Sequence, residues 1–343
     1  MSNKVKIAIN GFGRIGRLAL RRAYEDGGFE VVAINDLTSP KELAYLLKYD
    51  SAHGTFNHEV SCTETAIVVD GKEIPVIGNP DPSKLEWGKY GAEIVLECTG
   101  RLKGAKDAVI HVTAGGAKGV IISAPSDKET PTFVYGVNTD NLTADMKVIS
   151  GASCTTNCLG PVMKVIEDKF GVAGGFMTTV HAYTNDQTTL DLPKKGQLRR
   201  GRAAAQNIVP TTTGAAKAIN LVIPSLKGRL QGGAVRVPVL DGSLVDLSLK
   251  LNKKVTVEEM NAAMKEASEG ALKGVLGYTE DQIVSSDIIG ITCGSLFDAT
   301  QTMIYDNPEG EQFVKVVAWY DNEYSYTCQM MRLAKKYAEI LSK

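Results

Sequence analysis

The sequence of 343 residues has no long apolar run and no excess of charge of one sign. No segment approaches the ~20 consecutive apolar residues that a membrane-spanning helix needs. The short apolar run near the N-terminus is interrupted by Lys4 and Lys6 and is too short for a signal-peptide core. The 38 lysines and arginines nearly balance the 39 acidic residues, so the formal net charge is −1. We therefore expect no membrane partner and no net field that would attract nucleic acid.

Cysteine and histidine are also scarce, with six and four residues respectively. Six cysteines in so long a chain do not suggest a disulfide framework. Without an export signal, we expect reduced thiols and a cytoplasmic protein. Cys154 and Cys158 have C-x3-C spacing, with no histidine or cysteine cluster nearby to complete a zinc site. We therefore expect no metal.

The most informative glycines lie near the N-terminus. Gly11, Gly13 and Gly16 form G-x-G-x-x-G between an apolar strand, Val5–Asn10, and a segment with helical periodicity. The first glycine permits a tight turn, the second lets the backbone approach a pyrophosphate, and the third allows close helix packing. Asp36 ends the next apolar run, where an acid accepts hydrogen bonds from ribose hydroxyls and repels a 2′-phosphate. The motif alone can arise by chance, but the flanking strand, helix and acid favour NAD as the cofactor.

Further apolar runs extend this βαβ unit into a parallel sheet covered on both faces. They are Val31–Asn35, Ile94–Glu97, Gly119–Ile122 and Lys147–Ser150. After Ser153 the strands become longer and mix Thr and Ser with apolar residues, which is typical of a partly wet sheet. We predict an α/β protein with a Rossmann dinucleotide-binding domain over 1–151 and an α+β catalytic domain with a mixed or antiparallel sheet over 152–319. A C-terminal helix over about 320–343 is expected to pack back on the first domain.

Cys154 is the candidate nucleophile. It lies among small polar residues, where a strand ends and a helix over about 155–169 is predicted to begin. The dipole at a helix N-terminus stabilises a thiolate. Cys158, one helical turn further on, is interpreted as a core residue, because free cysteine usually behaves as a small apolar side chain.

His181 is the candidate partner of this thiol. It lies in a strand-like run just before Thr184 and could face a cleft. An imidazole can stabilise a thiolate and carry a proton near pH 7. His53 and His58 are interpreted as structural or solvent-exposed residues of a polar loop, and His111 as a residue of a surface helix. Spacing alone leaves the pairing of His181 with Cys154 open.

Five blocks of residues resemble the glyceraldehyde-3-phosphate dehydrogenase family. In chain order they are Asn10–Arg17, Ala152–Cys158, His181–Thr184, Pro210–Lys217 and Trp319–Glu323. The resemblance extends from residue 4 to about 335 and implies a phosphorylating, NAD-dependent glycolytic enzyme. It implies that the Cys154 thiolate attacks D-glyceraldehyde 3-phosphate, while His181 stabilises the thiolate and then accepts the hydroxyl proton. Inorganic phosphate would then attack the resulting thioester to give 1,3-bisphosphoglycerate.

The resemblance also implies the binding residues. For NAD they are Gly11, Phe12, Gly13, Arg14, Ile15, Gly16, Asp36, Ser123, Asn322 and Tyr326. Asn322 would orient the nicotinamide carboxamide, and Tyr326 would pack near that ring. Thr184 and Arg236 would hold the C3 phosphate of the substrate. The attacking phosphate would be received by Ser153, Thr155, Thr213 and Gly214, with Arg200 close to both phosphates.

Three alternatives stay open. The stretch Lys194–Arg202 carries five basic residues, which fits a solvated loop or a nucleic-acid patch that lacks stacking aromatics. The resemblance instead implies that this loop, which departs from many relatives, lies between subunits of a homotetramer. An erythrose-4-phosphate dehydrogenase would share the cysteine chemistry but release a free acid, and Thr213 and Gly214 favour the phosphorylating reaction. A primary role in binding RNA or a partner protein is disfavoured by the balanced charge.

Overall fold

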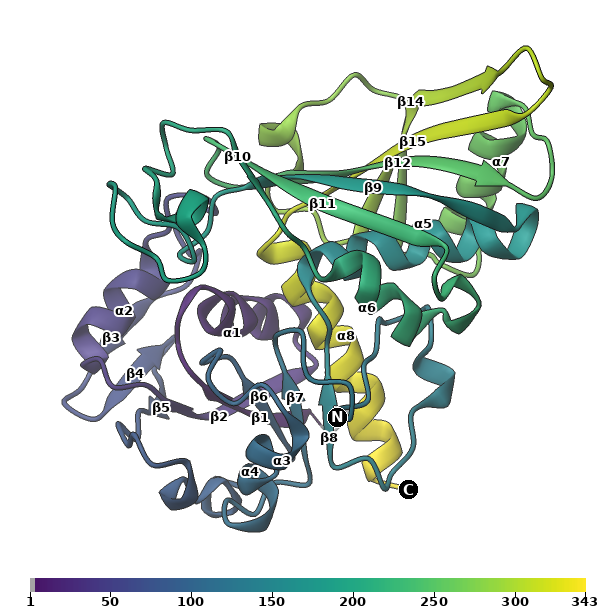
Figure 1. Ribbon diagram of the computed structural model, residues 1–343. Helices are drawn as coiled ribbons and strands as arrows, with labels where there is room; N and C mark the ends of the chain where they lie inside the picture. Colours follow the sequence, from purple (N-terminus) through teal and green to yellow (C-terminus); the bar gives the residue numbers. More distant parts are fainter. Residues whose placement is uncertain (1–3) are drawn as a thin grey trace. The chain divides into compact units, whose positions relative to one another are not determined.

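The computed structural model describes residues 4–343 and divides into two compact units (Figure 1). Unit 1 comprises the described residues up to Phe133 together with Thr139–Ala152 and Met330–Lys343. Unit 2 comprises Val134–Asn138 and Ser153–Gln329. The division differs from the boundaries expected from the sequence at two places. Val134–Asn138 belongs to unit 2, and the C-terminal part of unit 1 begins at Met330 rather than at about 320. Among residues 4–343, none of the helices combines the length and hydropathy needed to cross a bilayer.

Unit 1 is built on a five-stranded parallel sheet of order β2-β1-β6-β7-β8. The strands are β1 (Val5–Asn10), β2 (Phe29–Asn35), β6 (Ile94–Glu97), β7 (Gly119–Ile122) and β8 (Val148–Ser150). Helix α1 (Arg14–Asp26) packs on the face that carries Ile9. The short helices α3 (Ala105–Ala108) and α4 (Ile110–Thr113) cover the opposite face, which carries Ala8 and Val120. Cover on both faces explains why these strands are apolar at successive positions.

Several elements of unit 1 were not predicted from the sequence. They are α2 (Pro40–Lys48), the antiparallel strands β3 (Val60–Cys62), β4 (Ala66–Val69) and β5 (Lys72–Pro75), and the 3-10 turns η1 (Pro82–Lys84), η2 (Trp87–Tyr90) and η3 (Thr139–Asn141). Helix α2 begins after Ser39, whose hydroxyl accepts a bond from the backbone N–H of Glu42, and Pro40 occupies its first turn. This is the N-terminal signature expected of a helix.

Unit 2 is built on a seven-stranded sheet of order β10-β11-β9-β12-β15-β14-β13. The strands are β9 (Val172–Ala182), β10 (Val209–Thr211), β11 (Leu230–Val237), β12 (Ser243–Leu251), β13 (Leu276–Thr279), β14 (Ser295–Asp306) and β15 (Gln312–Tyr320). Strand β11 runs parallel to β9, and β13 runs parallel to β14, whereas the other neighbours are antiparallel. The prediction of an α/β protein whose second domain carries a mixed sheet is confirmed.

Helices α5 (Cys154–Phe170), α6 (Ala215–Val222) and α7 (Val257–Glu269) lie on one face of this sheet (Figure 1). Apolar side chains fill the layer between helices and sheet, among them Met163, Leu247 and Phe297. The remaining elements are the 3-10 turns η4 (Leu198–Gly201), η5 (Pro224–Leu226) and η6 (Ser285–Ile288), and the C-terminal helix α8 (Tyr324–Leu341). The packing of α5 fixes its N-terminus, and therefore Cys154, against the sheet.

Candidate functional site

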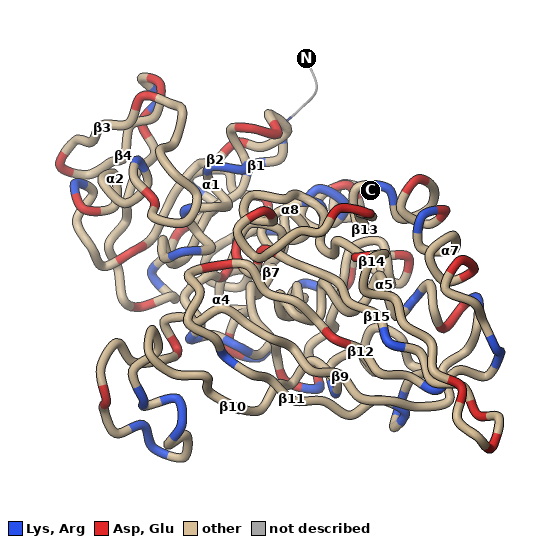
Figure 2. The backbone as a smooth tube through the Cα atoms, turned by 90° about the horizontal axis from the view of Figure 1, so that it is seen from above, with Lys and Arg blue, Asp and Glu red and all other residues tan. Residues whose placement is uncertain are grey.

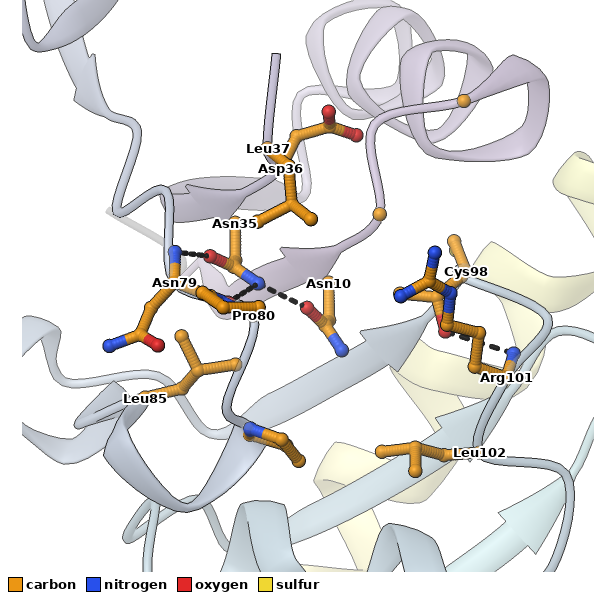
Figure 3. Close-up of a pocket in the computed structure, with 14 residues that line it drawn as sticks. Asn10, Asn35, Asp36, Leu37, Asn79, Pro80, Leu85, Cys98, Arg101 and Leu102 are labelled. Atoms are coloured by element: carbon orange, nitrogen blue, oxygen red, sulfur yellow. Dashed lines mark hydrogen bonds between the residues drawn. The ribbon is translucent and has the colours of Figure 1, made fainter.

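The first candidate site is a pocket of about 340 Å³ in unit 1, at the carboxyl ends of β1, β2 and β6 (Figure 3). Gly11 has a φ of +93°, and a Cβ added there would lie 2.7 Å from the backbone nitrogen of Thr99. A Cβ added at Gly16 would lie 2.2 Å from the carbonyl oxygen of Gly11, whereas the space above Gly13 is open. The backbone therefore requires glycine at two of the three motif positions and leaves room at the other.

The N-terminus of α1 suits a phosphate. Gly13 is the N-cap residue, and no side chain caps the helix. The first-turn N–H groups and the positive end of the helix dipole can therefore act on an anion in the open space above Gly13. These residues fit the pyrophosphate of a dinucleotide.

Asp36 holds the glycine turn in place. One carboxylate oxygen, Oδ2, accepts a hydrogen bond of 2.8 Å from the backbone N–H of Phe12. The other, Oδ1, accepts one of 3.0 Å from the backbone N–H of Thr38. Each carboxylate oxygen has a second lone pair, so Asp36 retains capacity for bonds from ribose hydroxyls, and this contact stays a prediction.

Two asparagines form a part of the pocket that the sequence analysis missed. The Asn35 Nδ2 group donates to Asn10 Oδ1 at 2.8 Å and to the carbonyl oxygen of Asn79 at 3.0 Å (Figure 3). Asn35 Oδ1 in turn accepts a bond of 2.8 Å from the Asn79 N–H. These bonds join the ends of β1 and β2 to the 79–82 segment. Polar residues at two adjacent strand ends were the available sequence signal.

Seven predicted cofactor residues do not line this pocket: Phe12, Arg14, Ile15, Gly16 and Ser123 of unit 1, and Asn322 and Tyr326 of unit 2. The Phe12 side chain is fully buried in the core. Arg14 pairs with Asp50, its Nη2 lying 3.1 Å from Asp50 Oδ1. Although burial opposes it, hydrogen bonds from His53 and Arg14 hold the pKa of Asp50 well below its usual range. The structure thus gives Phe12, Arg14 and Gly16 supporting positions around the glycine turn, and their contact with NAD stays a prediction.

The expectation that His111 lies on a surface helix is wrong. Its side chain is fully buried and joins a hydrogen-bond network beneath the pocket. The indole N–H of Trp87 donates to His111 Nδ1 at 3.0 Å, so the ring proton lies on Nε2, 3.0 Å from Glu97 Oε2. Asn10 Nδ2 donates to the same oxygen at 2.6 Å. The short helix α4 turns His111 inward because the ring pairs with a buried carboxylate.

The second candidate site lies in unit 2 and contains Cys154 and His181. Ser153 is the N-cap of α5, with its hydroxyl accepting a bond from the backbone N–H of Thr156, and Cys154 is the first helical residue. The Cys154 sulfur lies 3.5 Å from His181 Nε2. His181 Nδ1 lies 2.7 Å from the Ala182 carbonyl oxygen, which can only accept, and 3.0 Å from Arg236 Nη1, which can only donate. In the tautomer with the ring proton on Nδ1, the Nε2 lone pair faces the thiol.

The two groups share a dry environment. Burial raises the pKa of the Cys154 thiol, while the Arg236 charge and hydrogen bonds from Thr155 act against this rise. Burial, and then the Arg236 charge, lower the pKa of His181 to about 3. The α5 dipole and the attraction between an adjacent thiolate and imidazolium act in the opposite direction, toward proton transfer. The structure brings the two residues together, and their ionic pairing stays a prediction.

Arg236 lies beside His181 because β11 and β9 are neighbours in register. Arg236 pairs with His181 across the parallel strands. Its Nη1 group lies 3.0 Å from His181 Nδ1, and it donates to the Ala182 carbonyl at 2.9 Å and to the Thr184 hydroxyl at 3.4 Å. The predicted pair for the substrate phosphate, Arg236 and Thr184, thus lies on the far edge of the imidazole from Cys154.

The remaining anion residues lie near β10 and the start of α6. Arg200 donates from Nε to the Thr211 hydroxyl at 2.8 Å and from Nη2 to the Thr212 carbonyl at 3.0 Å, and it pairs with Asp186 through Nη1. Gly214 is the N-cap of α6, with no side-chain cap and open space where a Cβ would stand. Thr213 accepts a bond from the Ala215 N–H. This geometry suits an anion at the α6 N-terminus.

Comparison with known proteins supplies the family. The family model described as glyceraldehyde 3-phosphate dehydrogenase, NAD binding domain, matches residues 5–105, and the model of the C-terminal domain matches residues 153–322. The chain is 59% identical to glyceraldehyde-3-phosphate dehydrogenase of Clostridium pasteurianum, over 98% of this chain and 99% of that protein. This chain belongs to the glyceraldehyde-3-phosphate dehydrogenase family. It is also 56% identical to glyceraldehyde-3-phosphate dehydrogenase 1 of Bacillus cereus (96% of this chain, 97% of that protein) and 52% identical to the enzyme of Borreliella burgdorferi (97% and 99%).

Membership in the glyceraldehyde-3-phosphate dehydrogenase family confirms the resemblance seen in the sequence. It confirms NAD as the cofactor, because the matched domain is the family's NAD-binding domain and contains the pocket residues from Asn10 to Leu102. The glycine turn, the uncapped helix and Asp36 are consistent with that cofactor on geometric grounds.

Three residues near the end of unit 2 remain to be placed: Tyr320, Asn322 and Tyr326. Tyr320 was not singled out from the sequence, yet its hydroxyl lies 2.9 Å from the Thr155 hydroxyl and 2.8 Å from the Thr179 hydroxyl. Its ring meets His181 edge-on, at 5.7 Å between centroids. Asn322 is buried, and its side chain accepts a hydrogen bond from the Ser243 hydroxyl. Tyr326, in the first turn of α8, is also buried. Tyr320 therefore contacts both Thr155, near the N-terminus of α5, and the His181 imidazole.

Proposed function

We propose that this chain catalyses the NAD-dependent oxidation of D-glyceraldehyde 3-phosphate, with inorganic phosphate, to 1,3-bisphosphoglycerate. The observation that carries the proposal is the distance of 3.5 Å between the Cys154 sulfur and Nε2 of His181. A thiol beside a base, at a helix N-terminus, is the arrangement that nucleophilic catalysis on a carbonyl requires.

The first step forms a bond between the Cys154 sulfur and the aldehyde carbon. The thiol proton passes to His181 Nε2 and from there to the carbonyl oxygen, which gives a neutral hemithioacetal. Nε2 then takes the hydroxyl proton back as the carbon is oxidised. NAD supplies the hydride acceptor for this oxidation when it is bound. The product is a thioester on Cys154.

The second step breaks the carbon–sulfur bond. A phosphate oxygen attacks the thioester carbon, and Cys154 leaves as a thiolate that is placed at the positive end of the α5 dipole. Arg236 and Thr184 would bind the C3 phosphate throughout, and Gly214 with Arg200 would hold the attacking phosphate. Arginine suits these positions because its planar fork can bind phosphate with two hydrogen bonds.

The test follows NADH absorbance with glyceraldehyde 3-phosphate and NAD, with and without inorganic phosphate or arsenate. We expect rapid phosphate-dependent NADH formation that iodoacetate abolishes. Activity that does not depend on phosphate, or that occurs only with erythrose 4-phosphate, would contradict the proposed reaction while keeping the cysteine chemistry. The absence of NADH formation with both substrates would reject the enzymatic role.

We also propose that the chain forms a homotetramer in the cytoplasm. Five large apolar side chains are exposed on β9 and in the 190–208 segment: Phe176, Leu190, Leu192, Leu198 and Ile208. Such exposure favours contact with another copy of the chain. All six cysteines within residues 4–343 are free, which fits a reducing compartment. Light scattering of the wild type and of Leu198→Asp tests the assembly: a wild-type monomer would contradict it, and dissociation of the variant would support it.

The basic loop is paired internally, which argues against a nucleic-acid patch. Lys194 and Arg200 both pair with Asp186, and Arg202 pairs with Asp191 at 2.8 Å. The loop beside β10 carries acidic as well as basic segments (Figure 2). A filter-binding titration with RNA at physiological salt should show no tight, saturable binding that persists in the presence of NAD.

A further inference from the structure

Ser243 connects the strand that carries His181 to the residue predicted to orient the nicotinamide. Ser243 is the first residue of β12, and only 1% of it is exposed. Its hydroxyl accepts a hydrogen bond of 3.0 Å from the backbone N–H of Ala182. It also lies 2.6 Å from Asn322 Oδ1.

The Ala182 N–H determines which way the serine proton points. A backbone N–H can only donate, so it occupies one lone pair of the Ser243 oxygen. The hydroxyl proton then needs an acceptor, and Asn322 Oδ1 provides it. With the amide reversed, Asn322 Nδ2 would face the serine, and the buried hydroxyl proton would lose this acceptor. A buried donor without a partner is costly, so the amide is held with its oxygen toward Ser243.

The backbone of Asn322 is fixed as well. Its N–H donates to Asp241 Oδ1 at 3.2 Å, and the same oxygen accepts a bond of 2.7 Å from the Gly242 N–H. Ser243 of β12 pairs with Tyr320 of β15, and Tyr320 lies two positions before Asn322 in the sequence. Asn322 is thus held at both its main chain and its amide oxygen, and the two Nδ2–H bonds are the groups left to bind a ligand.

We propose that Ser243 is a positioning residue, which fixes the Asn322 amide so that it offers hydrogen-bond donors to the carboxamide oxygen of the nicotinamide. The inference rests on the proposed function, because it assumes that Asn322 meets the nicotinamide. A carboxamide presents both an acceptor and donors, so a fixed amide donor selects one rotational state of the ring. The residue acts through Asn322 and touches neither substrate nor cofactor.

The experiment measures binding rather than turnover. Dissociation constants for NADH and for ADP-ribose, which lacks the nicotinamide, are obtained by calorimetry for the full chain. Ser243→Ala should weaken NADH binding by about 3- to 10-fold, the effect of one neutral hydrogen bond, and leave ADP-ribose binding unchanged. Asn322→Ala should do the same, and adding Ser243→Ala to it should cause no further loss. Ser295→Ala, at another buried serine whose hydroxyl lies 3.4 Å from the Cys158 sulfur, is the matched control and should not alter the ratio.

A second variant tests the amide orientation without changing Ser243. Asn322→Asp keeps an oxygen for the Ser243 hydroxyl and replaces the Nδ2 donor by an acceptor. We expect it to weaken NADH binding by about 10-fold or more relative to ADP-ribose, because the carboxylate then faces the carboxamide oxygen. Under the opposite orientation the group left for the ligand is an oxygen in both proteins, and the ratio would stay near the wild-type value.

Each of four results would overturn the inference: an unchanged NADH to ADP-ribose ratio in Ser243→Ala, an equal loss for both ligands, additive losses in the double variant, or an unchanged ratio in Asn322→Asp. Phosphate-dependent turnover of the wild type is measured separately. If the variants show the expected binding pattern and the wild type shows no turnover, the proposed reaction is rejected and the role of Ser243 stands.

Discussion

The two candidate sites are built in different ways. The predicted phosphate site of unit 1 depends on the main chain: a glycine turn, an uncapped helix and a carboxylate that accepts bonds from two backbone N–H groups. The site of unit 2 is formed by side chains from separate elements. Cys154 and His181 are 27 positions apart, and His181 and Arg236 are 55 positions apart. Binding therefore depends on local backbone geometry in one unit, and chemistry depends on strand register and helix packing in the other.

This contrast predicts two classes of variant. Changes in the side chains of Cys154 and His181 in unit 2 should reduce turnover while the affinity for NADH persists. Changes in the backbone of unit 1 should reduce that affinity while Cys154 keeps its reactivity toward alkylating agents. A variant that crossed from one class to the other would break the comparison.

Cys154→Ser should have the largest effect. A serine hydroxyl is a far weaker nucleophile than a thiolate at neutral pH, so turnover should fall by at least about 10³-fold. NADH formation gives the turnover, and calorimetry should show NADH binding close to that of the wild type. Cys62→Ser, at an exposed cysteine, is the control and should remain active. Substantial activity in Cys154→Ser would remove Cys154 from the mechanism.

His181→Asn should reduce turnover by about 10²–10⁴-fold, because Nε2 no longer receives the thiol proton. Burial raises the pKa of the Cys154 thiol, and an imidazolium beside the thiolate would act against this rise. Removal of the imidazole should therefore raise the pKa of the thiol further. The pH midpoint for alkylation of Cys154 by iodoacetamide should therefore move upward in the variant. Identical alkylation profiles in the variant and the wild type would contradict the pairing of the two residues.

Gly16→Ala should disrupt the unit 1 pocket without affecting the chemistry. The added Cβ would lie 2.2 Å from the Gly11 carbonyl oxygen, so the glycine turn must move. We expect about 10-fold weaker NADH binding, a loss of about 1–3 kcal/mol in the free energy of unfolding, and unchanged alkylation of Cys154. In the control Gly174→Ala, in β9, the Cβ would come no closer than 3.4 Å to the Arg229 carbonyl oxygen. If Gly16→Ala bound NADH as tightly as the wild type, the close contact between Gly16 and the Gly11 carbonyl oxygen would not be needed for binding.

Asp36 combines charge with backbone geometry, and two substitutions separate these roles. Asp36→Gly should both weaken NADH binding and relax the discrimination against NADPH, because the bonds to the Phe12 and Thr38 N–H groups are lost. Asp36→Asn retains an acceptor for one of the two N–H groups and removes the charge, so it should improve NADPH binding relative to NADH by about 3- to 10-fold. Competition titrations with the two cofactors measure the ratio, and an unchanged preference in both variants would remove Asp36 from cofactor selection.

The same contrast explains what the sequence could predict. The glycine motif, the apolar strands and Asp36 are local patterns, so the parallel sheet and the pocket could be inferred from spacing alone. The pairing of Arg236 with His181 depends on β11 lying parallel to β9, which no local pattern reveals. His111 was misplaced because a four-residue helix carries too little periodicity to show which side is buried. Tyr320 and Ser243 act through hydrogen bonds to distant residues, and a resemblance alone gave them no role.

An effect on stability, rather than on binding or chemistry, is expected at Asp241. Burial, and then the neighbouring Asp321 carboxylate, raise the pKa of Asp241 to about 8. The folded protein therefore holds a proton that the unfolded chain releases near pH 4, and this contribution to stability is present below that pH and is lost as the pH rises through about 8. Asp241→Asn keeps an acceptor for the Gly242 and Asn322 N–H groups and removes the titration. Between pH 5 and 8 its free energy of unfolding, measured with urea, should fall less steeply than that of the wild type, by up to about 1.4 kcal/mol per pH unit. Asp246→Asn, at a carboxylate that pairs with Lys315 at 2.8 Å, is the control. Parallel stability curves for Asp241→Asn and the wild type would mean that Asp241 binds no extra proton in the folded protein, and that the turn before β12 is stabilised by its backbone hydrogen bonds without any contribution from titration.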